Sequence, residues 1–221
     1  MRATLDLGDG PLQLLPERAV WRPRERALFV ADLHLGKAAA FRAFGAPAPT
    51  GASEETLRRL GALVDEMAPE KLVVLGDFVH AVPSMTKGLT ASLVEWRERR
   101  ASVDCVVVLG NHDRRAGAWL AGCGFTPVEA PAVHAGCECR HFPLEEAEAL
   151  APGPTLLAGH LHPMTRLRGP GRDSLRLPCF VVSGRQVVLP AFGEFTGGAF
   201  ISRSPGARLL AATELGVFEA G

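Results

Sequence analysis

Four short clusters of metal-binding and proton-transferring residues each follow an apolar run. They are Asp32-Leu33-His34, Gly76-Asp77, Gly110-Asn111-His112-Asp113 and Gly159-His160-Leu161-His162. Carboxylate, amide and imidazole ligands without a thiolate suit manganese, iron or zinc in a catalytic site better than they suit a structural zinc site. A single histidine of this kind is usually an ordinary loop or core residue. The same arrangement after four separate runs predicts one shared site.

The apolar runs before these clusters are the elements that must position them. Their sequences are ALFVA (27–31), KLVVL (71–75), CVVVL (105–109) and TLLA (155–158). Continuous rather than alternating apolar residues indicate strands that are buried on both faces, which is typical of parallel strands covered by helices. The carboxyl ends of parallel strands share one edge of a sheet, where ligands bind. We therefore expect the four clusters to meet.

The rest of the pattern indicates an α/β protein with two packed sheets and helices outside. A hairpin is expected around LQLLPERAVW (12–21). Ser53 is the expected N-cap of a helix with acidic residues in its first turn and an apolar face extending to Met67. A second helix is expected near residues 89–100. Beyond residue 130 most of the chain is expected to form strands, and no linker or repeat divides it, so one domain is predicted.

Composition limits the possible functions. The 221 residues carry 24 Lys and Arg against 24 Asp and Glu, so a nucleic-acid ligand would have to be bound by a local positive patch or by metal ions. No signal peptide or membrane-spanning run is present. Five cysteines, an odd number, favour reduced thiols and a cytoplasmic location over disulfides. The C-x-C pair at Cys137 and Cys139 has no second pair that would complete a zinc site.

The motifs D-x-H, G-D, G-N-H-D, a later His and G-H-x-H, in that order, resemble the calcineurin-like metallophosphoesterase superfamily. This resemblance implies a sandwich of two mixed sheets flanked by helices (αββα), here as one domain over residues 1–221. GDFVHAVPS (76–84) resembles the double-strand-break repair nucleases of the superfamily. DLHLGK (32–37), GHLHP (159–163) and LRLPCFVVSGRQVVLPAFGEFTGG (175–198) resemble the ligase-associated DNA damage response endonucleases, the PdeM family, over nearly the whole chain.

The resemblance implies two divalent metal ions, with manganese expected and iron or zinc as alternatives. One ion would be held by Asp32, His34, Asp77 and His162, and a second by Asp77, Asn111, His160 and one further histidine. Such a pair clamps the phosphoryl oxygens during in-line displacement. The resemblance also implies that His112 stabilises or protonates the leaving alkoxide. Asp113 is expected to accept a hydrogen bond from the other nitrogen of His112, as in a Ser-His-Asp triad.

The further histidine is His134 or His141. These residues lie on the two arms of a predicted hairpin that turns near Ala135-Gly136, so only one can reach the metals. We favour His141, because the family usually places proline shortly after this ligand, as at Pro143, and because His134 would sit in the turn.

Several further residues could contact the substrate. Arg114 and Arg115 follow the G-N-H-D motif, and Arg166, Arg168, Arg172 and Arg176 follow G-H-L-H, where they could hold phosphates. His80 is either near the substrate or an ordinary loop residue. Trp96, Trp119 and the phenylalanines are expected in the core rather than as platforms for base stacking.

The predicted function is a manganese-dependent endonuclease that acts on single-stranded DNA in DNA repair. The family name implies a functional association with an ATP-dependent DNA ligase and a helicase. The repair nucleases that it resembles continue into a capping domain, whereas this chain ends at Gly221, so an open site is expected. A small-molecule or nucleotide phosphoesterase using the same metals is the alternative. A non-enzymatic scaffold is disfavoured because every motif position is filled, and a purple acid phosphatase is excluded because the chain has no tyrosine.

Overall fold

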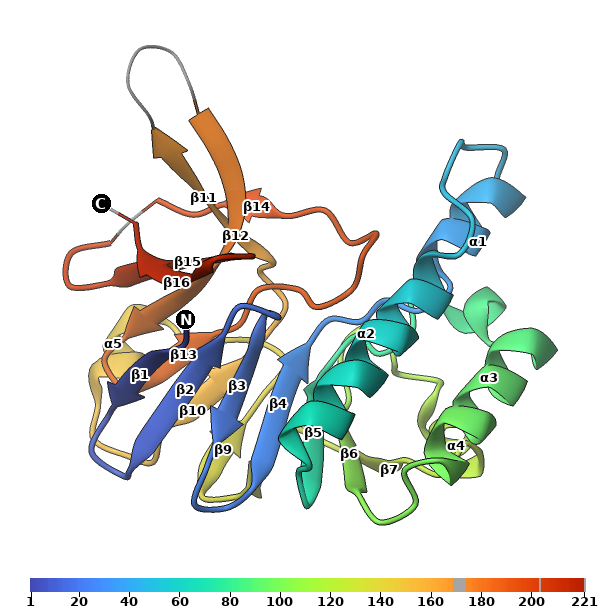
Figure 1. The fold of residues 1–221 in the computed structure, drawn as a ribbon, viewed down its shortest axis with the longest axis horizontal. Coiled ribbons are helices and arrows are strands. Elements are labelled where there is room, and N and C mark those ends of the chain that lie inside the picture. Colours follow the sequence, from blue (N-terminus) through green and yellow to red (C-terminus); the bar gives the residue numbers. More distant parts are fainter. Residues whose placement is uncertain (169–173, 203, 221) are drawn as a thin grey trace.

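The first of two β-sheets combines antiparallel and parallel strands (Figure 1). The computed structural model describes residues 1–168, 174–202 and 204–220. Within them, the order in this sheet is β1 (Ala3–Asp6), β2 (Pro11–Leu15), β3 (Ala19–Arg22), β4 (Ala27–Ala31), β5 (Lys71–Leu75), β6 (Asp104–Val108) and β7 (Thr126–Val128). Pairing is antiparallel from β1 to β4 and parallel from β4 to β7. The predicted hairpin and the predicted parallel strands are thus confirmed.

The second sheet contains the strands predicted for the later part of the chain. Its order is β14 (Ala199–Phe200), β11 (Pro163–Arg168), β12 (Ser174–Ser183), β13 (Gln186–Val188), β10 (Leu156–Ala158), β9 (Cys137–Cys139) and β8 (Ala132–His134). A further strand, β15 (Arg208–Thr213), pairs with β12 and with β16 (Gly216–Glu219). The strands β9, β10 and β13 are mutually parallel. TLLA therefore does not join the other three apolar runs in one sheet.

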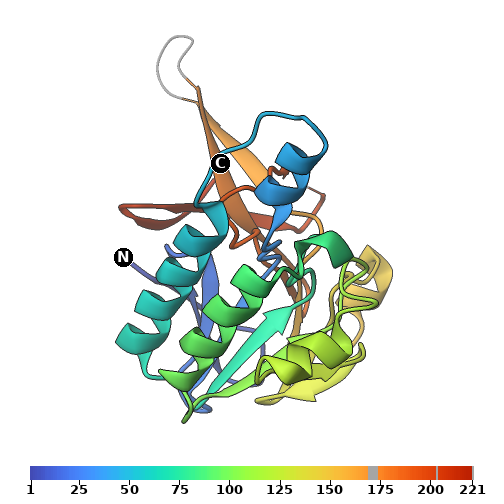
Figure 2. The same ribbon diagram turned by 90° about the vertical axis from the view of Figure 1, so that its right-hand side faces the viewer.

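Helices cover the outer face of the first sheet (Figure 2). In chain order the structure has α1 (Lys37–Ala43), α2 (Ala52–Met67), the short 3-10 helix η1 (Val82–Ser84), α3 (Lys87–Glu98), α4 (Gly117–Gly122) and α5 (Glu146–Leu150). One apolar core packs α2, α3 and α4 against this sheet, and a second fills the space between the sheets. Alternate residues of the parallel strands enter the two cores, as with Leu28 and Phe29 of β4. This accounts for their uninterrupted apolar sequence.

The start of α2 differs from the prediction. The helix begins at Ala52 after Gly51, and Ser53 lies inside its first turn. The Ser53 hydroxyl accepts a hydrogen bond from the Gly36 backbone N–H at 2.8 Å instead of capping its own helix. The prediction was wrong because a tertiary partner competes for the hydroxyl group. Helix α3 is capped by Thr86, whose side chain accepts from Leu89 N.

All five cysteines are buried free thiols. Cys137 and Cys139 face the core between the sheets, and Arg22 donates a hydrogen bond to the Cys137 sulfur at 2.8 Å. Cys137 and Cys139 are thus free thiols, the alternative favoured for the C-x-C pair. Among the described residues, no helix is long and apolar enough to cross a membrane.

Candidate metal centre

The loops after β4 and β5 continue side by side beyond the ends of the strands. Asp32 N donates to Gly76 O at 3.2 Å and His34 N donates to Asp77 O at 2.8 Å. A parallel bridge then joins Leu35 to Val79. Because backbone hydrogen bonds extend the pairing, the side chains of Asp32, His34 and Asp77 are held next to one another.

The second sheet supplies three more histidines at the same end of the sandwich. His141 follows β9, and His160 and His162 follow β10. The backbone N–H of His160 donates to Asp32 Oδ2 at 2.8 Å, which ties this loop to the loop after β4. The shared edge predicted from the sequence is therefore built from both sheets, with the β4 and β5 ends facing the β9 and β10 ends.

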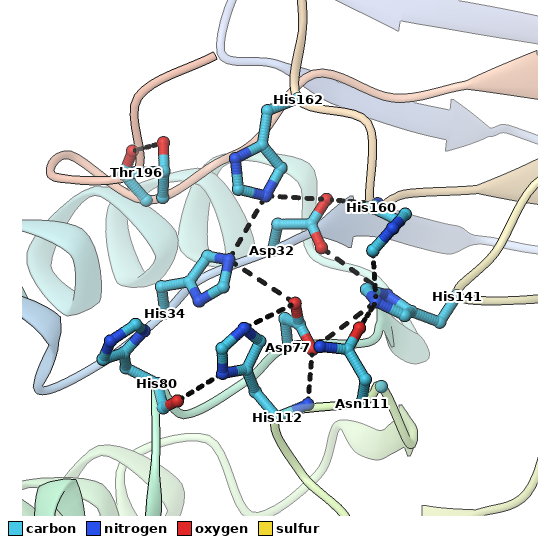
Figure 3. Close-up of polar contacts among 12 residues, drawn as sticks. Asp32, His34, Asp77, His80, Asn111, His112, His141, His160, His162 and Thr196 are labelled. Carbon is cyan, nitrogen blue, oxygen red and sulfur yellow. Dashed lines mark hydrogen bonds and ion pairs between the residues drawn. The ribbon is translucent and has the colours of Figure 1, made fainter. Parts of the chain in front are cut away.

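One group of candidate ligands contains Asp32, His34 and His162, with ligand atoms within 4.8 Å of one another. His34 Nε2 lies 3.2 Å from His162 Nε2, and His162 Nε2 lies 3.7 Å from Asp32 Oδ2. His34 Nε2 is also 3.5 Å from Asp77 Oδ2. The four side chains named in the sequence for one ion thus converge (Figure 3).

A second group contains Asp77, His141 and His160. His141 Nε2 lies 2.9 Å from Asn111 Oδ1, 3.0 Å from His160 Nδ1 and 3.5 Å from Asp77 Oδ1. Asp77 turns Oδ2 toward His34 and Oδ1 toward His141, so this carboxylate lies between the two groups. The two groups stand side by side in Figure 3.

The β8–β9 hairpin places His134 and His141 far apart. β8 and β9 pair antiparallel, with Ala135 and Gly136 in the turn, as predicted. His134 lies at the turn end, and His141 lies beyond the other end of β9 among the candidate ligands. Six of the seven histidines gather in this region, and His134 is the exception.

The backbone of the candidate ligands is strained. Nine described non-glycine residues have positive φ, and five of them are Asp32, His34, Asp77, His160 and His162. This conformation is uncommon for side-chain-bearing residues, and such strain concentrates at functional sites where the surrounding structure enforces it. The surrounding structure here is the network of backbone hydrogen bonds between the loops.

Two motif glycines leave room for ligands from other strands. A Cβ on Gly76 would lie 2.0 Å from His141 Nδ1, and a Cβ on Gly110 would lie 2.3 Å from Asp77 Oδ1. Glycine before each motif therefore lets imidazole and carboxylate groups approach the backbone closely. This close packing explains why glycine stands at the start of the G-D and G-N-H-D motifs.

Burial sets the electrostatics of the cluster. Asp32 is 0% exposed, and burial together with the neighbouring charge of Asp77 raises its pKa well above the ordinary value. Burial also raises the pKa of Asp77. It lowers the pKa of His34 to about 2, and the pKa values of His141 and His162 to about 4. Neutral imidazoles beside two crowded carboxylates offer lone pairs that a cation can accept.

One buried atom supports the same interpretation. Asp32 Oδ1 has no hydrogen-bond partner among the described residues. A buried polar atom without a partner is costly unless something binds it. The mixed oxygen and nitrogen donors, without thiolate, fit divalent manganese, iron or zinc. The residues present thus fit a pair of divalent cations.

His112 stands beside these groups and is held by a residue other than the predicted one. Its Nδ1 donates to the His80 carbonyl oxygen at 2.5 Å, and its Nε2 lies 4.0 Å from Asp77 Oδ2. The His80 ring also stacks on the His112 ring, with centroids 5.0 Å apart. The sequence left His80 open between a residue near the substrate and an ordinary loop residue, and a role for its carbonyl group cannot be read from residue type.

The predicted role of Asp113 is wrong. Its carboxylate is 0% exposed and accepts hydrogen bonds from three backbone N–H groups, those of Phe78, Val79 and Gly110, at 3.0–3.1 Å. These hydrogen bonds join the loops after β5 and β6, while His112 Nδ1 donates to the His80 carbonyl oxygen instead. Asp113 therefore links the two loops by hydrogen bonds.

Lys37 was missed as a site residue. Its ammonium donates to Thr196 O at 2.8 Å and interacts electrostatically with Asp77, His34 and His162. It is the last residue of the DLHLGK segment, and no function was assigned to it from the sequence. Burial lowers its pKa from the usual value.

Four of the predicted substrate arginines are exposed on two different parts of the surface. Arg114 and Arg115 are exposed on the loop after Asp113. Arg166 and Arg176 are exposed on β11 and β12. Arg172 and the side chain of Arg168 lie outside the described residues.

This fold, with two carboxylates, an amide and four imidazoles at the end of a two-sheet sandwich, defines a metal-dependent phosphoester hydrolase. The family model described as calcineurin-like phosphoesterase matches residues 25–143, and the chain belongs to that family. A nuclease called MPE from Pseudomonas putida has a similar crystal structure, with a TM-score of 0.82 and 37% sequence identity. The likeness covers 99% of this chain and 100% of that one. No curated protein matches the chain.

Proposed function

We propose that this protein is a manganese-dependent endonuclease that cuts single-stranded DNA internally and acts in DNA repair. The observation that carries the proposal is the likeness to a nuclease at 37% identity over nearly the full length, combined with the complete set of candidate ligands. The donor set supports manganese, with iron or zinc as alternatives. The proposal includes a functional association with an ATP-dependent DNA ligase and a helicase.

The ligand assignment follows the two groups of side chains. One ion is held by Asp32, His34, Asp77 and His162, and the other by Asp77, Asn111, His141 and His160. When bound, the two ions supply Lewis-acid activation of the phosphodiester and of the attacking water. Asp77 would be shared because its carboxylate lies between the two groups.

His112 is the proposed acid for the leaving oxygen. Its Nδ1–H is committed to the His80 carbonyl, so Nε2 is the nitrogen left to face the centre. The His112 side chain is 36% exposed, which leaves this edge open to a substrate. A proton on Nε2 would pass to the alkoxide as the P–O bond breaks. A positioned acid of this kind contributes about 10²–10⁴ in rate.

The remaining basic residues would bind the polymer. Lys37 places a positive charge beside the carboxylates, and exposed Arg114 and Arg115 can reach phosphates that flank the scissile one. A single strand bends a phosphate into such a site at less cost than a stiff duplex does.

The proposal is tested by metal-dependent cleavage with a matched pair of histidine variants. Wild type, His141→Ala and His134→Ala are stripped of metal, reloaded with manganese, magnesium, zinc or iron, and assayed on a labelled single-stranded oligonucleotide. We expect manganese to support cleavage by wild type and by His134→Ala. His141→Ala should lose most of its bound metal, measured by metal analysis, and most of its cleavage activity, measured by the oligonucleotide assay.

Two results would contradict the proposal. Full metal content in His141→Ala would remove this ligand from the assignment. Hydrolysis of nucleotides or short diesters by the wild type without any cleavage of DNA would favour a small-molecule phosphoesterase.

A further inference from the structure

A ribbon formed by β12, β11 and β14 presents two arginines and a phenylalanine on one face. Arg166 of β11 lies directly opposite Arg176 of β12, and Met164 of β11 lies opposite Phe200 of β14. Because Arg166 is two residues beyond Met164, it shares the face of Phe200. The guanidinium carbons of Arg166 and Arg176 lie 5.1 and 5.2 Å from the centre of the Phe200 ring.

Phe200 is not a core residue, contrary to the expectation for the phenylalanines. It is 48% exposed on a two-residue strand. The hairpin of β11 and β12 projects from the sandwich beside β14 (Figure 1). An aromatic ring grouped with guanidinium planes at an exposed strand is the kind of surface on which nucleobases stack.

A cavity connects this surface with the metal centre. Its volume is about 390 Å³, and its lining includes Phe200, Arg176, Arg18, Thr196 and the candidate ligand His162. Thr196 also accepts the hydrogen bond from Lys37. In Figure 3, Thr196 and His162 lie on the same side of the ligand cluster. A group bound in the cavity would therefore lie beside a substrate phosphate bound at the metal centre.

The charges that line the cavity suit an anion. Glu194 also lines it, but this carboxylate is ion-paired with Arg59. Arg18 carries a positive charge in this lining, where burial and the nearby Arg59 lower its pKa and Glu194 raises it. A phosphate placed near Arg18 and Arg176 would offset that charge.

We propose that this cavity is a nucleotide-binding subsite that holds a residue of single-stranded DNA next to the scissile phosphate. The base stacks on Phe200 and on the guanidinium planes of Arg166 and Arg176. Arg176 and Arg18 bind the adjoining phosphate. The inference rests on the proposed function, because it names how that same site selects a polymer.

Binding and cleavage are measured separately to test it. Metal-loaded protein is titrated into a fluorescent oligo(dT) with phosphorothioate linkages, which slow cleavage, and anisotropy gives Kd. Phe200→Ala and Phe200→Leu should raise Kd by about 5- to 100-fold, because both remove the stacking ring. Arg176→Gln should weaken binding and reduce the dependence of log Kd on log salt by about one.

The controls separate the subsite from general effects. Phe218→Ala removes an exposed phenylalanine of β16, and Arg58→Gln removes an exposed arginine of α2, so both should bind like wild type. The Phe200 and Arg176 variants should lose less activity on bis-p-nitrophenyl phosphate than on DNA, because this substrate has no flanking nucleotide.

The contradicting results are distinct. Wild-type Kd in the Phe200 and Arg176 variants would overturn the subsite, as would an equal loss on bis-p-nitrophenyl phosphate. A wild type that binds oligo(dT) but never cuts DNA would contradict the proposed function, while the comparison of Kd values would still decide the subsite.

Discussion

At the scale of single residues, His112 offers the clearest separation of metal binding from chemistry. Its ring is held by a backbone carbonyl and it contributes no atom to the two ligand groups that contain the carboxylates. His112→Ala should therefore keep its metals and lose about 10²–10⁴ in kcat on DNA. The loss should be much smaller on bis-p-nitrophenyl phosphate, whose phenolate leaves without protonation. Steady-state kinetics on both substrates, with metal analysis, provide the measurement.

Equal losses on the two substrates would show that His112 binds the phosphate instead of protonating the leaving group. His134→Ala is the matched control, since His134 lies at the far end of the β8–β9 hairpin and should leave both rates unchanged.

At the scale of elements, Asp113 joins the loops after β5 and β6. An asparagine in its place has only one acceptor oxygen, so at least one backbone N–H of Phe78, Val79 or Gly110 would face an amide donor. We expect Asp113→Asn to lower the free energy of unfolding by about 2–4 kcal/mol in urea denaturation. Asp65→Asn, which weakens an exposed ion pair with Arg100, should cost less than about 1 kcal/mol. Equal stability of the two variants would remove this role from Asp113.

The glycine of the G-N-H-D motif offers a second test of how elements position ligands. An added methyl group at Gly110 would collide with Asp77 Oδ1, whereas Gly122 in α4 has nothing within 4 Å of the same position. Gly110→Ala should bind manganese about 10- to 100-fold more weakly by calorimetry, because Asp77 must move. Gly122→Ala should bind it normally. Unchanged affinity in Gly110→Ala would show that Asp77 is not held where the structure places it.

Much of this arrangement could be predicted from sequence, because buried parallel strands leave a distinct pattern and motifs sit at their ends. The β8–β9 hairpin and the placement of His141 followed from the turn at Ala135-Gly136. What could not be predicted depends on tertiary partners. The Ser53 hydroxyl accepts a hydrogen bond from Gly36 N–H, and the Asp113 carboxylate accepts from backbone N–H groups. The His80 carbonyl accepts the hydrogen bond from His112 that was expected to go to Asp113. Residue types alone do not show which of several polar partners a side chain will bind in the folded structure.

At the scale of the whole molecule, both sheets contribute ligands, so the metal centre depends on their packing. We infer that residues 1–221 act as one domain, since Val217 of β16 donates a backbone hydrogen bond to Met1 at 3.1 Å. Because the net charge is zero, the proposed DNA substrate would have to be attracted by the metals and by local groups such as Lys37, Arg18 and Arg176. Binding should accordingly weaken as salt concentration rises.

The central claim is that this metal centre cuts single-stranded DNA away from its ends. Closed circular single-stranded DNA has no ends, so incubation with the manganese-loaded protein tests the claim directly. We expect the circle to be converted first to full-length linear strands and then to shorter fragments, with no conversion by Asp77→Asn. An intact circle, under conditions in which the same protein hydrolyses bis-p-nitrophenyl phosphate, would contradict the account.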